Sequence, residues 1–155
     1  PQNKESAYLH LPTYIGGIFY HIGIFLSLLA FVWFWIAGYF NLQLPVIINQ
    51  IIAGLLMVSA LCGLSILLKR IFSPESRVLS TPDDYLSNAL ATAMVAVSGL
   101  VFLGFSIPVI YHLIMTAMFL WLPFGKTKHV LYFFFARYHL GYFYGRRGTW
   151  PIPKM

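Results

Sequence analysis

Two histidines lie near one end of two different apolar segments of this chain. His21 is close to the start of an uncharged run that continues to Phe40, and His129 comes just after Lys126 and Lys128. Two neutral imidazoles that face each other from two helices can supply both axial ligands of a haem iron, which is how membrane bundles hold haem b without covalent attachment. The similar depth of the pair therefore predicts a haem site, with His21 and His129 as its metal ligands.

A simpler interpretation is that each imidazole hydrogen-bonds to a backbone carbonyl or lies in the lipid headgroup layer. Ionisable groups within membrane segments are costly and are often functional, which favours ligation for His21. His129 lies closer to the end of its segment and fits the simpler interpretation more easily. His112 lies about a turn into its segment from the opposite end, too far from His21 to pair with it, and His10 and His139 lie on the flanks, where surface positions are expected.

The composition is that of a membrane protein. Of 155 residues, 59% are hydrophobic and 9% are charged, too few polar side chains to cover a soluble globule. Basic residues beside apolar segments usually record membrane topology and contact with anionic lipid, so the net charge of +6 does not predict nucleic-acid binding. Cys62 is the only cysteine, so the chain forms no intrachain disulfide and cannot hold an iron–sulfur cluster alone.

Uncharged runs convert directly into membrane crossings, because a bilayer core of about 30 Å takes about 20 helical residues. The long uncharged stretch from Tyr85 to Gly125 has to contain a turn, and the stretch from Gly104 to Pro108 has the residue types for one. We expect one all-α membrane domain over residues 1–155, an integral membrane four-helix bundle. Its predicted crossings and tail are 14–40, 46–68, 85–103 and 108–134, followed by 135–155.

The Lys and Arg residues all flank the same ends of these crossings, and the connections around 41–45 and 104–108 carry none. By the positive-inside rule that side is cytoplasmic, and both termini lie there. The basic residues are Lys4, Lys69, Arg70, Arg77, Lys126, Lys128, Arg137, Arg146, Arg147 and Lys154. Those expected over the anionic haem propionates are Arg70, Arg77, Lys126 and Lys128.

The chain resembles the gamma subunit of respiratory nitrate reductases, a family that includes membrane subunits of heterodisulfide-reductase-like complexes. The stretches that carry the resemblance are FYHIGIFLSLL, KRIFSPESRVLSTPDDYL and YHLIMTAMFLWLPFGKTKHVLYFF, within about Phe19 to Phe135. The resemblance implies a multi-pass b-type cytochrome of a prokaryotic inner membrane. It would pass electrons between menaquinone or another quinone and an iron–sulfur subunit on the cytoplasmic side, with His21 and His129 as ligands of the haem nearest that partner.

One position departs from the family pattern. The nitrate reductase subunits carry a second histidine ten residues after the first, which completes an outer haem with the equivalent of His112; here that position is Phe31. We therefore expect one haem per chain, an outer half filled by aromatics such as Phe31, Trp33 and Trp35, and a quinone that reacts close to the single haem. His112 either serves an outer haem through an unrecognised ligand or, with Tyr111, hydrogen-bonds a quinone headgroup.

The tail RYHLGYFYGRRGTWPIPKM is rich in Tyr, Arg and Trp. These residue types suit docking to a partner subunit, and equally suit an anchor at the lipid headgroups. The competing function is a haem-free membrane anchor subunit that tethers a soluble redox enzyme. A channel or transporter is least favoured, because the spans carry no acidic residue.

Overall fold

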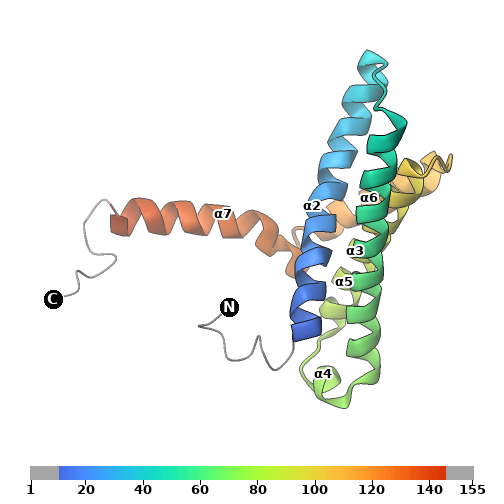
Figure 1. The fold of residues 1–155 in the computed structure, drawn as a ribbon. Helices are drawn as coiled ribbons and strands as arrows, with labels where there is room; N and C mark the ends of the chain where they lie inside the picture. Colours follow the sequence, from blue (N-terminus) through green and yellow to red (C-terminus); the bar gives the residue numbers. More distant parts are fainter. Residues whose placement is uncertain (1–10, 146–155) are drawn as a thin grey trace.

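The computed structural model describes residues 11–145, which are helical throughout most of their length and contain no strand. The side chain of Leu131 is not described. His10, Lys4 and the last part of the predicted tail, 146–155, lie outside the described residues. The elements are α2 (Leu11–Phe40), α3 (Val46–Phe72), α4 (Pro74–Val78), α5 (Pro82–Phe102), α6 (Pro108–Trp121), the 3-10 turn η1 (Lys126–Lys128), α7 (His129–Leu140) and the π-helical turn η2 (Gly141–Gly145) (Figure 1).

Three helices, α2, α3 and α5, are long and apolar enough to cross a membrane. The predicted crossings 14–40, 46–68 and 85–103 correspond to them, with ends that differ by up to four residues. α3 continues through Lys69 and Arg70. The backbone can remain helical there because the long side chains of these residues extend their charges out of the apolar layer. The expectation of an all-α membrane fold is therefore confirmed in this coarser form.

The turns between crossings lie where the sequence predicts them. Asn41 and Gly104 both adopt positive φ, 54° and 96° respectively, at the ends of α2 and α5. Glycine tolerates this left-handed conformation without a steric cost, and asparagine tolerates it better than most residues. Pro108 then starts α6, where its missing N–H needs no partner.

The predicted fourth crossing, 108–134, is wrong as a single helix. α6 ends at Trp121, and a second helix, α7, begins only at His129. Pro123 has no N–H to continue the helical ladder, and Gly125 is extended, with φ of −83° and ψ of 178°. As a result α7 leaves the bundle sideways, transverse to α2 (Figure 1).

Small residues let the helices approach closely. α2, α3 and α5 all pack on one another, and α6 packs on α5. The buried positions include Gly23, Ser27 and Ala30 on α2, Ser59, Ala60 and Gly63 on α3, and Ala91 and Ser98 on α5. Lipid is as apolar as a leucine side chain, so close packing and interhelical hydrogen bonds hold membrane helices together. The Ser59 hydroxyl donates to the Phe19 carbonyl at 2.8 Å, and Ser27 donates to Ser98 at 3.3 Å.

One acidic side chain joins three elements at the basic end of the bundle. Asp84 Oδ1 lies 2.8 Å from an Arg70 guanidinium nitrogen and 2.7 Å from Lys126 Nζ. Its second oxygen accepts the Thr81 N–H at 2.9 Å, which caps the start of α5. Lys69 Nζ donates to the Thr13 hydroxyl at 2.8 Å and ties α2 to the same end. The described cations of α3 and η1 thus gather at one end of the bundle, as expected.

We predict that Gly63→Ala destabilises the chain by about 1–3 kcal/mol, because a Cβ at position 63 collides with the Tyr20 ring and the Thr92 hydroxyl. The matched control is Gly54→Ala on the same helix, where a Cβ has nothing within 4 Å. Unfolding of the detergent-solubilised protein, followed by circular dichroism, measures the difference. Equal stability of the two variants would contradict the close approach of α2 and α3.

Candidate functional site

His21 lies on the outer surface of α2, and its buried neighbour sets that orientation. Tyr20 points into the bundle, where its hydroxyl lies 3.1 Å from the Asn88 carbonyl and 2.9 Å from Thr92 Oγ1. Successive helical residues point about 100° apart, so an inward Tyr20 leaves His21 exposed. His21 Nδ1 lies 2.7 Å from the Gly17 carbonyl oxygen. A carbonyl only accepts, so Nδ1 carries the proton and the lone pair of the neutral ring is on Nε2.

A shallow apolar groove surrounds His21. Its volume is about 570 Å³, and its lining comes from α2 alone: Thr13, Tyr14, Gly17, Ile18, His21, Ile22 and Phe25. Gly16 and Gly17 leave open space where a side chain would otherwise stand. A flat apolar ring can therefore approach this face of α2 closely. A second wall has to come from another element or another molecule.

His129 is the first residue of α7 and is tied to the basic end of the bundle. Its Nδ1 hydrogen-bonds to the Lys126 carbonyl oxygen, so its Nε2 also carries the lone pair of the neutral ring. Lys126 is held in turn by two aspartates: its backbone N–H donates to Asp83 at 3.2 Å and its Nζ pairs with Asp84. The Trp121 indole N–H donates to Ser87, which donates to Asp83. This network fixes the point from which α7 starts.

The two predicted ligands lie near the same end of the bundle but do not touch in the part of the chain that the structure describes. Tyr20, beside His21, is level with Asn88 on α5, and Lys126 is level with Asp84. Those α5 positions are four residues apart, which is about 6 Å along a helix. α7 packs on η1 and η2 rather than on α2. The similar depth that the sequence predicts is present, whereas the face-to-face pairing is absent from the isolated chain.

His112 belongs to a separate aromatic pocket near the opposite end. The pocket has a volume of about 390 Å³ and is lined by Phe31, Phe34, Trp35, Gly38, Tyr39, Tyr111 and His112. The imidazole contacts Trp35 edge-on, and its Nδ1 donates to the Pro108 carbonyl at 2.7 Å. The Tyr111 hydroxyl is buried without a hydrogen-bond partner among the described residues.

Aromatic rings fill this outer region, as expected from Phe31. The Phe31 ring lies 5.2 Å from that of Phe119 and 6.4 Å from those of Trp35 and Tyr111, measured between centroids. Trp33, like Phe31, packs against the hydrophobic core. Phe31 thus bridges α2 and α6.

The cations expected over haem propionates divide into three groups. Arg70 and Lys126 are both paired with Asp84. Lys128 directly precedes His129 and is the one closest to a predicted ligand in the chain. Arg77 lies in α4, at a groove between α3 and α5 that contains no histidine. Of the four, Lys128 is thus the one that adjoins a predicted ligand in the chain and has no ion pair with Asp84.

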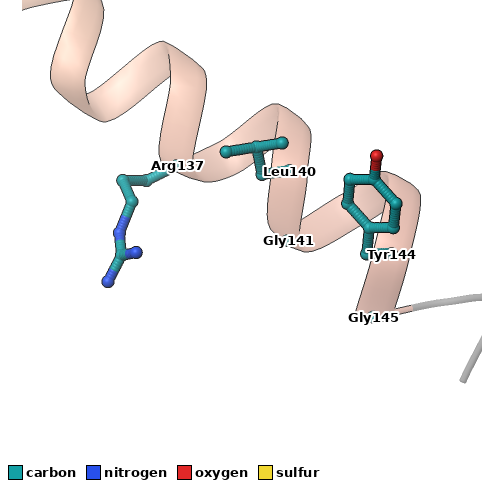
Figure 2. A pocket seen from close by; sticks show the side chains of 5 residues that line it. All are labelled: Arg137, Leu140, Gly141, Tyr144 and Gly145. Carbon is teal, nitrogen blue, oxygen red and sulfur yellow. The ribbon is translucent and has the colours of Figure 1, made fainter. Parts of the chain in front are cut away.

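A larger hollow lies away from these histidines. It has a volume of about 740 Å³ and is lined by Arg137, Leu140, Gly141, Tyr144 and Gly145, all from the end of α7 and from η2. Figure 2 shows the five lining residues along one helical ribbon, with the Arg137 side chain extending away from it. The end of α7 and η2 together form this hollow, and its lining residues include no His, Cys, Asp or Glu.

A bare metal centre is also not supported. Within residues 11–145, no group of three or more His, Cys, Asp or Glu side chains is arranged to hold a metal ion. A haem iron needs only two protein ligands, because the porphyrin supplies the other four.

Sequence reasoning missed two residues that position the candidate ligands. Asp84 holds Lys126 and hence His129, and Tyr20 turns His21 outward. The ion pair of Asp84 with Lys126 had a signal in the sequence, because two acidic residues start α5 at the membrane end where the cations gather. Nothing local reveals the second, since the partners of Tyr20 lie 68 and 72 residues away in the chain.

We predict that Asp84→Asn destabilises the chain by about 1–3 kcal/mol, because it leaves the Arg70 and Lys126 cations without their carboxylate. Glu75→Gln on α4 is the control, since Glu75 forms no salt bridge among the described residues. Chemical unfolding in detergent measures stability, and limited proteolysis near Lys126 measures the loosening of η1. If both variants behave as the unaltered protein does, the Asp84 contacts do not hold this end of the bundle.

No protein-family model matches this chain, and comparisons with curated proteins and with solved structures also gave no match. The function proposed below therefore depends on the residues and their geometry, together with the resemblance seen in the sequence.

Proposed function

We propose that this chain is the b-type cytochrome subunit of a membrane oxidoreductase, and that it passes electrons between a quinone and an iron–sulfur subunit. One observation carries the proposal: His21 and His129 lie near the same end of the bundle, and the Nε2 of each has no partner among the described residues, while the Nδ1 of each hydrogen-bonds to a backbone carbonyl as the simpler interpretation also expects. Metal-binding histidines commonly donate their other ring N–H to a carbonyl, which fixes the tautomer and the orientation of the ring. The resemblance to nitrate reductase gamma subunits points to the same pair.

The chain offers specific residues for one haem between α2 and the start of α7. When bound, the haem supplies one-electron chemistry, and the protein tunes its potential through the ligands and their surroundings. His21 would ligate from α2, and His129 from the first turn of α7. Gly17 leaves room for the macrocycle, and Lys128 is placed to neutralise a propionate. This arrangement requires the start of α7 to face the groove on α2.

We also infer the topology. α6 has 14 residues, about 21 Å of helix, and the following turn reaches Asp83 at the basic end. Together they make a fourth crossing, which gives a four-helix bundle. The positive-inside rule then places the basic end, and both termini, in the cytoplasm of a prokaryotic cell.

The pocket around His112 is the best candidate for the quinone headgroup. His112 Nδ1 donates to the Pro108 carbonyl, so Nε2 of the neutral ring can accept from a quinol hydroxyl, and the protonated ring can donate to a quinone carbonyl. Phe31 and Trp35 provide the apolar walls for the ring. Phe31 follows His21 by ten residues, about 15 Å along α2, so a headgroup in this pocket would lie at a different level of the bilayer from the proposed haem, not close to it as the single-haem expectation has it.

A haem-free anchor subunit is the second candidate, and α7 favours it. This helix packs on none of the bundle helices within the described residues and exposes Tyr132, Phe135 and Tyr138. A projecting aromatic helix is a suitable docking surface for a soluble enzyme. An anchor would use this surface without needing His21 or His129.

We predict one haem b per chain, and that His21→Ala and His129→Ala each remove it, because one remaining imidazole leaves the iron five-coordinate. His139→Ala, on the same helix as His129, is the control and retains the haem. Pyridine haemochrome analysis against protein concentration gives the ratio, and the reduced spectrum reports low-spin ligation. A ratio near two means that a second ligand set exists, and a ratio near zero favours the anchor.

His21→Gly separates ligation from folding. Added imidazole should restore the low-spin spectrum if His21 is a ligand, because the free base can occupy the space that the side chain leaves. Recovery of haem without imidazole would contradict the assignment.

We predict that His112→Gln keeps the haem but slows its reduction by quinol at least tenfold, since glutamine can hydrogen-bond but cannot exchange a proton near neutral pH. Stopped-flow reduction by a menaquinol analogue measures the rate, and dithionite reduction is the control for an intact haem. Loss of haem in this variant would instead identify His112 as an iron ligand.

A further inference from the structure

The structure has a third groove, distinct from the surroundings of His21 and His112. It lies between α3 and α5, beside α4, and has a volume of about 750 Å³. Leu67 and Ile71 from α3, with Leu86 and Ala89 from α5, form its apolar lining. Arg77 and Ser80 lie at the end of the groove near the α3–α5 connection. We propose that this groove binds an anionic phospholipid, with its phosphate on Arg77 and an acyl chain along the apolar lining.

The positive charge of Arg77 favours an anionic lipid headgroup. Among the described residues, the Arg70 and Lys126 cations pair with Asp84, and Lys69 donates to Thr13. The Arg77 guanidinium has no ion pair and no hydrogen bond within residues 11–145, and its side chain is exposed. Guanidinium matches a phosphate in charge and in its fork of N–H donors.

The neighbouring hydroxyls do not compete with Arg77 for this role. The Ser80 hydroxyl donates to the Ser76 carbonyl at 2.6 Å, and the Tyr85 hydroxyl donates to the Arg70 carbonyl at 3.3 Å. Both donors are therefore already used. Arg77 is the donor left to bind a phosphate at this end of the groove.

The connection between α3 and α5 has the composition of a segment that lies in the headgroup layer. Phe72, Val78 and Leu79 are 73%, 87% and 84% exposed, next to cations at the basic end of the bundle. Apolar side chains that insert beside basic ones are typical of membrane-interface segments. Lipid phosphates lie at this level of a bilayer, and acyl chains extend inward from it. Leu67, Leu86 and Ala89 continue the groove in the same inward direction from Arg77. The inference depends on the membrane location of α3 and α5 and not on haem.

The test uses the full chain in detergent, with phosphatidylglycerol and phosphatidylcholine of identical acyl chains as probes. Native mass spectrometry should show phosphatidylglycerol retained at least tenfold more tightly than phosphatidylcholine. Arg77→Gln should abolish this preference, and Ala89→Phe, which fills the groove, should weaken binding of both lipids. Arg137→Gln is the matched control, because it removes an exposed cation from α7 and should leave binding unchanged.

Several outcomes would overturn the proposal. They are equal retention of the two lipids, an Arg77→Gln variant that keeps the preference, or an Arg137→Gln variant that loses it equally. Competition by glycerol phosphate at the same concentration would show that the groove binds free phosphate rather than lipid. Displacement by an equimolar menaquinone analogue would show that it is a quinone site. Circular dichroism of each variant confirms that a loss of binding does not reflect unfolding.

Discussion

The pairing of Asp84 with two cations is the contact on which the basic end of this protein depends. Asp84 opens α5, Arg70 closes α3, and Lys126 follows α6, so one carboxylate joins three segments that lie far apart in the sequence. The Asp84 side chain is only 10% exposed, and a carboxylate withdrawn from water needs such partners. The same contact fixes the start of α7, because the Lys126 carbonyl also holds the His129 ring.

Close packing of small residues holds the helices together inside the bundle. With Gly23, Ser59 and Gly63 at the contacts, α2, α3 and α5 leave no internal space for a cofactor. A haem bound as proposed would lie on the outer face of α2, where His21 is exposed. The proposed haem site is accordingly an interface, completed by α7 and by any subunit that packs there.

The three candidate binding sites of this protein lie on separate surfaces. The groove of His21, the aromatic pocket of His112 and the groove of Arg77 have no lining residue in common. Under the proposed function, these surfaces would serve haem binding, quinone binding and lipid binding separately. It also means that each surface can be altered by mutation without disturbing the other two.

The sequence by itself determined where most of the helices lie. Uncharged runs ended by Lys69 and Arg70, or by Asn41 and Gly104, depend only on the local residue types, and the structure follows them. The gathering of the described cations at one end also followed from their order along the chain. The break after Trp121 was locally encoded by Pro123 and Gly125, but their effect was underestimated because the surrounding run is uncharged.

Only the tertiary structure decided which face of each helix is buried. α2 is apolar on every side, because lipid and protein interior accept the same side chains, so no periodic pattern shows that Tyr20 points inward and His21 outward. The partners of Tyr20 on α5 and the ion pairs of Asp84 join residues tens of positions apart. The direction of α7 likewise depends on how the network around Lys126 closes, and no local property of residues 129–140 specifies it.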